Sequence, residues 1–154
     1  MRFLLVDRIL EYEPGKAIQG IKNVTMSDDF LEDHFPRFPV MPGVLQLEAL
    51  VQLASWLVWI TKDRKFKGIL KQFGVIKFKD IIKPGDQLIL DVTFSKVEKE
   101  ELIFSGSVRV GGEVKTTLKD GVLNFIPLEE IEDSENTKEF FEYITGKKPK
   151  GILD

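Results

Sequence analysis

Two hydrophobic periods divide the chain into a helical part and a strand-rich part. Residues 44 to 60 (VLQLEALVQLASWLVWI) are apolar almost all round, which predicts a helix that other elements must enclose. From residue 87 onwards apolar and polar residues alternate, as in Leu88, Leu90, Val92 and Phe94, which indicates strands with one buried face. The chain therefore combines one long helix with an antiparallel sheet.

Turn residues set the boundaries of the predicted strands. Apolar segments at 3 to 12 and 17 to 25 flank Glu13-Pro14-Gly15-Lys16 and predict an opening hairpin. Turn signals at 83 to 86, 99 to 100 and 111 to 112 predict four consecutive strands from about residue 69 to 126, joined as an antiparallel meander. In the last strand the alternation changes phase at Asp120-Gly121, which predicts a β-bulge.

One long hydrophobic helix and one long antiparallel sheet have one economical arrangement, in which the sheet curls around the helix and buries it. We therefore expect an α+β domain with a hot-dog fold over residues 1 to 126. Residues 127 to 154 begin with an acidic run and end with a basic one. We expect them to form a C-terminal appendage with a short helix around 138 to 144.

Composition narrows the class of protein. The chain has 154 residues, a formal net charge of −3 and 43% hydrophobic residues, which suits one folded domain and excludes global disorder. Its mild acidity argues against nucleic-acid binding. The absence of cysteine excludes disulfides, thiolate metal sites and a cysteine nucleophile, and fits a cytoplasmic protein.

Neither the start of the chain nor its most apolar stretch predicts a membrane segment. The first residues lack the pattern of a secretory signal. Residues 44 to 60 carry Gln46, Glu48 and Gln52 and are too short and too polar for a confident span. We expect no membrane span and no metal site.

A proline-rich stretch carries the only histidine, His34. Prolines at 36, 39 and 42 forbid a continuous helix over residues 28 to 42 and favour rigid, extended backbone. His34 is either a base that works near neutral pH or a solvated loop histidine. The helix that follows begins at about Pro42-Gly43, where the Gly43 N–H can face an oxygen that gains negative charge.

Three polar side chains share one face of the apolar helix. Glu48, Gln52 and Ser55 occur at i, i+4 and i+7, a spacing that aligns them. Enclosed carboxylates are rare unless they are paired or used, so Glu48 is either a structural carboxylate bonded to Gln52 or loop backbone, or a catalytic acid. With His34 as the base and the Gly43 N–H as an oxyanion donor, these groups could run an elimination.

The segment HFPRFPVMPGVLQLEALVQ resembles the 3-hydroxyacyl-[acyl-carrier-protein] dehydratases of fatty acid synthesis, the FabZ type of the FabA/FabZ hot-dog family. LLVDRILEYEPG and FKDIIKPGDQLILDV resemble the opening strand and a strand-turn-strand of that family, so the resemblance covers about residues 1 to 126. The chain departs from the usual HFPGHP pattern, with Arg37 in place of the glycine and Phe38 in place of the second histidine.

The resemblance implies a role for each matched residue. His34 is implied as the base that removes the proton alpha to the thioester, and Glu48 as the acid that protonates the leaving hydroxyl. The amides of Gly43 and Val44 are implied to face the thioester carbonyl, and Gln52 to support the carboxylate. The implied products are a trans-2-enoyl thioester and water, from a lyase that needs no cofactor of its own.

The resemblance also implies partners. The substrate arrives on the phosphopantetheine of acyl carrier protein, and the His and Glu of one site come from different protomers of a homodimer, often built further into a trimer of dimers. Residues 62 to 83 hold eight basic and two acidic residues. Lys62, Arg64, Lys65 and Lys67 are therefore candidates for docking an acidic carrier, or belong to an ordinary solvated helix end.

Two other functions fit the same fold. A hot-dog thioesterase would use Glu48 to activate water and would not need His34. A noncatalytic acyl-carrier-protein binding module would be closed by Arg37 and Phe38. The aromatic residues Trp56, Trp59 and Phe73 are candidates for lining an acyl tunnel, or for core or dimer contacts.

Overall fold

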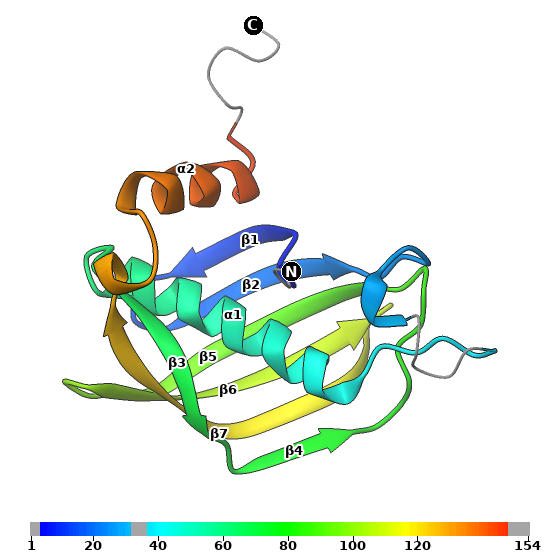
Figure 1. Cartoon of the computed structure of the whole chain (residues 1–154). Helices are drawn as coiled ribbons and strands as arrows, with labels where there is room; N and C mark the ends of the chain where they lie inside the picture. Colours follow the sequence, from blue (N-terminus) through cyan, green and yellow to red (C-terminus); the bar gives the residue numbers. More distant parts are fainter. Residues whose placement is uncertain (1–3, 32–36, 148–154) are drawn as a thin grey trace, which may run out of the picture.

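The computed structural model describes residues 4–31 and 37–147, which form a curled antiparallel sheet around one central helix (Figure 1). The strands and helices, with η for a short 3₁₀ turn, are β1 (Arg8–Glu13), β2 (Ala17–Asn23), η1 (Asp29–Leu31), α1 (Gly43–Thr61), β3 (Phe66–Gln72), β4 (Val75–Phe78), β5 (Gln87–Val97), β6 (Glu101–Val110), β7 (Glu113–Pro127), η2 (Leu128–Glu130) and α2 (Ser134–Ile144). The α+β hot-dog architecture predicted from the sequence is confirmed.

The sheet order is β1-β2-β5-β6-β7-β3, and β4 also pairs with β7. The opening hairpin β1-β2 and the run β5-β6-β7 are antiparallel, as predicted. The prediction of a four-strand meander from residue 69 is wrong, because β3 and β4 do not pair with β5. Instead, β3 pairs with the second half of the long strand β7, and β4 pairs with its first half.

The predicted bulge divides β7 between these two partners. The register between β6 and β7 shifts after Phe104, which pairs with Gly121, and Asp120 has a positive φ of 56°. A Cβ on Gly121 would lie 2.5 Å from the buried Phe104 ring, so glycine is required there. The bend lets one strand serve two partners.

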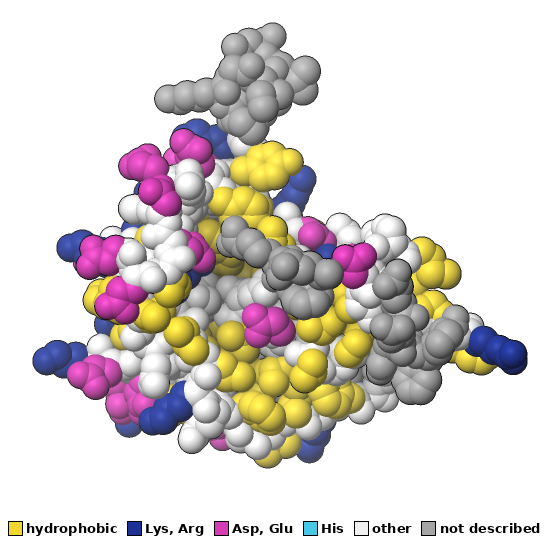
Figure 2. Space-filling view, viewed as in Figure 1, with side chains coloured by type: hydrophobic (Ala, Val, Ile, Leu, Met, Phe, Trp, Pro, Cys, Tyr) yellow, Lys and Arg dark blue, Asp and Glu magenta, His cyan; other side chains and the backbone are white. Residues whose placement is uncertain are grey.

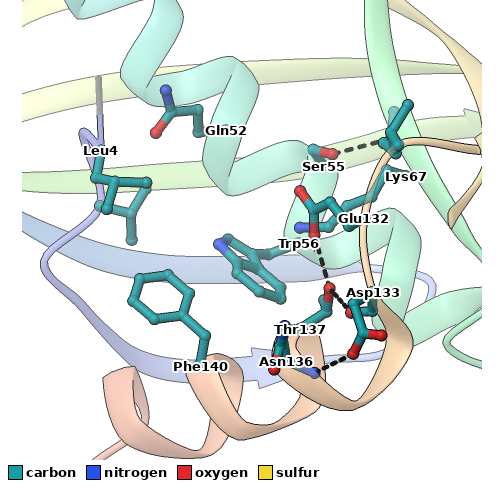
Figure 3. Close-up of a pocket in the computed structure, with 13 residues that line it drawn as sticks. Leu4, Gln52, Ser55, Trp56, Lys67, Glu132, Asp133, Asn136, Thr137 and Phe140 are labelled. Carbon is teal, nitrogen blue, oxygen red and sulfur yellow. Dashed lines mark hydrogen bonds between the residues drawn. The ribbon is translucent and has the colours of Figure 1, made fainter. Parts of the chain in front are cut away.

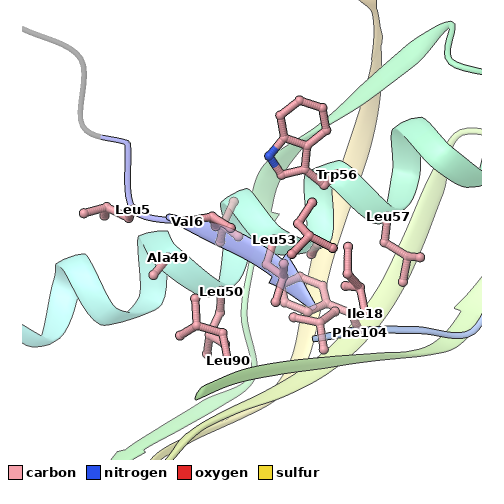
Figure 4. Packing of buried hydrophobic residues seen from close by; sticks show 14 of the residues in the cluster. Leu5, Val6, Ile18, Ala49, Leu50, Leu53, Trp56, Leu57, Leu90 and Phe104 are labelled. Atoms are coloured by element: carbon pink, nitrogen blue, oxygen red, sulfur yellow. The ribbon is translucent and has the colours of Figure 1, made fainter. Parts of the chain in front are cut away.

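Helix α1 fills the concave side of the sheet. Leu50, Leu53 and Leu57, spaced along one face, are fully buried and contact strand residues such as Leu90 and Phe104 (Figure 4). The helix is long and apolar enough to meet the length and composition test for a membrane span, yet 67% of its most apolar window is buried inside the fold. It is the core helix of this domain.

Helix α2 lies on the open side of the molecule, over the C-terminal half of α1 and near β1 (Figure 1). Asp133 caps it by accepting a hydrogen bond from the Asn136 N–H at 2.9 Å, which explains why the helix begins four residues before the Lys138 start expected from the sequence. The buried side chain of Phe141 packs against Trp56, Trp59 and Tyr12.

Candidate active site

Proline and a neighbouring strand fix the start of α1, where the candidate oxyanion donors lie. Pro42 occupies the N-cap and α1 begins at Gly43, as predicted. The Met41 N–H donates to the Ile82 carbonyl at 2.7 Å, which ties this segment to the loop after β4. Because the first N–H groups of a helix have no intrahelical acceptor, those of Gly43 and Val44 are the candidate oxyanion donors.

The tip of a ring on β4 packs against Gly43. A Cβ at this position would lie 2.6 Å from Cζ of Phe78. Any larger residue at position 43 must therefore displace this ring, which is 52% exposed, or the helix start. Val44, by contrast, has a side chain that is 69% exposed, so only its backbone is a candidate for the site.

Glu48 lies one to two turns along α1 and is held by Gln52. The Gln52 Nε2 donates to Oε1 of Glu48 at 3.1 Å, and the Leu5 N–H donates to Oε1 of Gln52 at 2.8 Å. The backbone of Leu5 thereby orients the amide, leaving its NH₂ group toward the carboxylate. Glu48 is half-buried, so one of its faces is open to a ligand.

The third member of the polar face has a structural partner. Ser55 is buried, and its Oγ accepts a hydrogen bond from the Gly68 N–H at 2.9 Å. The sequence pattern aligned Ser55 with Glu48 and Gln52, but the structure ties its hydroxyl to β3.

Sequence reasoning missed Gln46, which buttresses the helix start. Its side chain is 3% exposed, its Nε2 donates to the Met41 carbonyl at 3.2 Å, and its Oε1 accepts a hydrogen bond from the Thr116 hydroxyl on β7. A polar residue within an apolar helix was the available signal. Gln46 does not lie on the helix face that Glu48 and Gln52 share.

His34 lies outside the described residues, within 32–36. The neighbouring departures from the family pattern, Arg37 and Phe38, are both exposed, and Phe38 is 77% so. Neither of these two side chains fills the interior of the chain.

The basic residues predicted for docking lie in different settings. Lys62, Arg64 and Lys65 follow the C-terminus of α1, the opposite end from Gly43. The prediction that Lys67 docks the carrier is wrong. Lys67 is 7% exposed, and its Nζ lies 3.2 Å from the centroid of the Trp56 ring. Because the Lys67 side chain on β3 is buried, it is not part of a docking surface.

The aromatic candidates also separate. Trp56 lines a cavity between α1 and α2 (Figure 3), and Trp59 is buried at 1% exposure in the aromatic cluster under α2. Phe73 lies between β3 and β4 and is 43% exposed. Within residues 4–31 and 37–147, no group of three or more histidine or carboxylate side chains could hold a metal ion.

A sheet wrapped around a single long helix is the hot-dog fold, and here that helix begins at Gly43 and carries Glu48. Solved structures agree on the fold. The ApeI:P dehydratase heterocomplex from Xenorhabdus doucetiae matches with a TM-score of 0.58 and 17% identity over 75% of this chain and 91% of that one. The smu.793 protein from Streptococcus mutans, solved with acetyl CoA, matches with a TM-score of 0.64 and 16% identity over 82% of this chain and 94% of that one.

The sequence comparisons identify the family. Residues 1–118 match the model of the FabA-like domain. The 3-hydroxyacyl-[acyl-carrier-protein] dehydratase FabZ of Caldanaerobacter subterraneus is 44% identical over 131 residues, 83% of this chain and 89% of the relative. That of a Polaromonas species is 46% identical over 112 residues, 70% of this chain and 77% of the relative. The chain therefore belongs to the FabZ-type dehydratases of the FabA-like family, and it is an enzyme, as the sequence analysis predicted.

Proposed function

We propose that this dehydratase converts a (3R)-3-hydroxyacyl chain on acyl carrier protein to the trans-2-enoyl chain and water, with His34 as base and Glu48 as acid. The observation that carries the proposal is the fixed carboxylate of Glu48, which Gln52 holds at 3.1 Å one to two turns beyond the Gly43 helix start. Relatives that share 44% identity bear the name of this activity. The enzyme acts in fatty acid or related lipid synthesis.

The chemistry follows from these groups. His34 takes a proton from C2 of the thioester, and the electron pair of that bond forms the C2–C3 double bond. Glu48 supplies the proton with which the C3 hydroxyl leaves as water. The N–H groups of Gly43 and Val44 stabilise the charge that develops on the thioester oxygen, because they lie at the positive end of the helix dipole. The protein's own residues supply every group used, and the phosphopantetheine arrives with the substrate.

We also propose that the working unit is a homodimer in which His34 and Glu48 of one site come from different chains. Apolar side chains that are 43–69% exposed occur on β3, on β4, in the segments that follow these two strands and at the start of α1; they are Val44, Ile69, Phe73, Val75, Phe78 and Ile81. Figure 2 shows hydrophobic side chains spread over the face where Figure 1 places β4 and the first turns of α1. Apolar patches of this kind mark association surfaces. Further assembly into a trimer of dimers is part of the same proposal.

Complementation tests the sharing of sites. His34→Ala and Glu48→Gln chains are co-refolded in equal amounts, and each alone is the control. If sites are shared, half of the dimers are mixed and each holds one intact site, so about a quarter of wild-type activity returns. If both residues of a site come from one chain, mixing restores nothing.

We propose that the carrier docks on basic residues near the start of α1. Lys77, Lys79 and Lys83 are exposed. Lys77 and Lys79 flank Phe78, whose ring lies against Gly43, and Lys83 follows in the loop after β4. The 19 residues of α1 span about 28 Å, which separates Lys62, Arg64 and Lys65 from the Gly43 of the same chain. The test reverses the charges of Lys77, Lys79 and Lys83 in one variant and those of Lys62, Arg64 and Lys65 in another. The set whose reversal weakens carrier binding and its salt dependence is the docking set.

The direct test of the reaction is mass spectrometry of 3-hydroxyacyl-carrier protein incubated with the enzyme. Loss of one water from the intact acyl-carrier supports the proposal. Release of a free acid would indicate the thioesterase, and an unchanged but bound carrier would indicate the binding module.

A further inference from the structure

A cavity of about 830 Å³ lies between α1, β3 and the C-terminal segment that includes Ile131 and Phe140 (Figure 3). Its wall includes Gln52, the residue that holds Glu48, and continues one turn further along α1 at Ser55 and Trp56. The cavity therefore begins beside the proposed catalytic carboxylate and leads away from the helix start.

The order of groups along α1 matches the order of atoms in a 3-hydroxyacyl thioester. Gly43 would face the oxygen on C1, and Glu48 the hydroxyl on C3. The rest of the acyl chain must then lie beyond Glu48. Gln52 and Trp56 follow at steps of about 6 Å along the helix axis, so an acyl chain that continues past Glu48 in this direction would enter this cavity.

Helix α2 forms the opposite wall and is held firmly. Phe140 and Phe141 have ring centroids 6.1 and 5.5 Å from that of Trp56, and Phe141 is 5% exposed. The Leu128 N–H donates to the Lys65 carbonyl at 2.8 Å, which fixes the chain where it leaves β7. Such a wall is part of the folded core rather than a loose tail.

The cavity becomes polar at the first turn of α2, where Asp133, Asn136 and Thr137 line it. The Thr137 hydroxyl lies 2.7 Å from a carboxylate oxygen of Glu132, and the buried Lys67 ammonium lies over the Trp56 ring. Methylene groups pushed into this end would take charged and hydroxyl groups out of their polar contacts without replacing them, which is costly. An apolar chain is therefore favoured only along the part of the cavity near Gln52, Trp56 and Phe140.

We propose that the segment from η2 through α2 closes the cavity and sets the upper limit of acyl chain length, with Phe140 and Thr137 as specificity-determining residues. This inference rests on the proposed function, because it assigns the cavity to the tail of that substrate. This segment lies beyond residues 1–118, the part of the chain that matches the family model. The proposed chain-length limit is therefore set by a segment outside the matched domain.

The test compares kcat/KM for 3-hydroxybutyryl, 3-hydroxyoctanoyl and 3-hydroxyhexadecanoyl carrier protein. Two full-length variants open the far wall in different ways: Phe140→Ala removes a ring, and the pair Glu132→Leu with Thr137→Val replaces the polar end by an apolar one. Tyr143→Ala is the matched control, because Tyr143 is on α2 but is 60% exposed and does not line the cavity.

We expect wild type to prefer the shorter chains. Each opened variant should raise the ratio of kcat/KM for the hexadecanoyl over the octanoyl substrate by about tenfold or more, the scale on which apolar pockets discriminate chain length. Tyr143→Ala should leave that ratio unchanged. A ratio that stays within twofold of wild type in both opened variants, with turnover intact, would overturn the inference.

Binding separates this inference from the proposed function. If wild type dehydrates none of the three substrates, the proposed function fails, and the dissociation constants of octanoyl- and hexadecanoyl-carrier protein still test the cavity. A tenfold shift of their ratio in Phe140→Ala would support the wall as a chain-length limit. An unchanged ratio would contradict it.

Discussion

The side-chain amide of Gln52 donates to Oε1 of Glu48 at 3.1 Å, while its own oxygen accepts the backbone N–H of Leu5 at 2.8 Å. The backbone before β1 thus orients the Gln52 amide, and the amide in turn orients the Glu48 carboxylate. Gln52 is a positioning residue for the acid in this arrangement, because it acts on the reacting atoms only through Glu48.

Replacing Gln52 by Leu should lower kcat by about 10- to 100-fold, because the acid is misplaced. Any change in KM reports instead on the cavity wall, which Gln52 also lines. The lost partner of the Leu5 N–H should also cost about 1–3 kcal/mol of stability. Steady-state kinetics and urea unfolding measure the two effects.

Thr61→Val is the matched control for Gln52. The Thr61 hydroxyl also accepts a distant backbone N–H, that of Gly15 at 2.9 Å, but at the other end of α1. It should lose stability without losing kcat. Equal losses of kcat in Thr61→Val and Gln52→Leu would show that Gln52 is only structural.

Gly43→Ala should be destabilised by about 1–3 kcal/mol, the usual cost of overpacking, and should lose kcat because the displaced Phe78 ring or helix start moves the oxyanion donors. The contact of 2.6 Å that a Cβ would make with Phe78 is the reason. A Phe78→Leu change in the same chain should recover part of both losses, as measured by a double-mutant cycle. Full activity and stability in Gly43→Ala alone would refute the role of this contact.

Gln46→Leu should cost about 2 kcal/mol, since it leaves the Thr116 hydroxyl and the Met41 carbonyl without their buried partner. Adding Thr116→Val should return part of that cost, because an apolar pair needs no hydrogen bond. Urea unfolding of the four proteins gives the coupling energy. A coupling near zero would mean that the Gln46–Thr116 bond does not hold the helix start.

Stability should depend on pH through Asp80, which lies in the loop that holds Met41. The Lys115 ammonium, 2.7 Å away, lowers the pKa of Asp80, helped by the Ile81 N–H. Because the pKa of Asp80 is lower in the folded state, the ionised carboxylate stabilises the folded protein at pH values above the ordinary aspartate pKa of about 4. This stabilisation is lost as the pH falls below that value. Asp80→Asn should therefore melt below wild type at pH 7, and the two melting temperatures should converge in acid. A difference that stays constant down to pH 2 would contradict this assignment.

Local patterns predicted the elements well. The hairpin turn, the start of α1 at Gly43, the inward faces of β5 and β6 and the bulge at Asp120 each follow from backbone preferences or alternation over a few residues. The placement of β3 and β4 on β7 did not follow, because strand pairing between distant segments leaves no local pattern.

The candidate site was also predicted only in part, because local spacing is visible in the sequence and contacts between distant segments are not. The spacing of Glu48 and Gln52 on one helix face was enough to pair them, and their hydrogen bond is confirmed. The burial of Lys67 and the role of Gln46 depend on which distant residues, Trp56 and Thr116, lie opposite. No run of neighbouring residues contains that information.

The most direct test is mass spectrometry of 3-hydroxyoctanoyl-carrier protein with wild type, His34→Ala and Glu48→Gln. We predict that wild type removes one water and that each variant is slower by about a hundredfold or more, as expected for loss of a general base or acid. Undiminished loss of water in either variant, or none with wild type, would contradict the assignment of His34 and Glu48 as the catalytic pair.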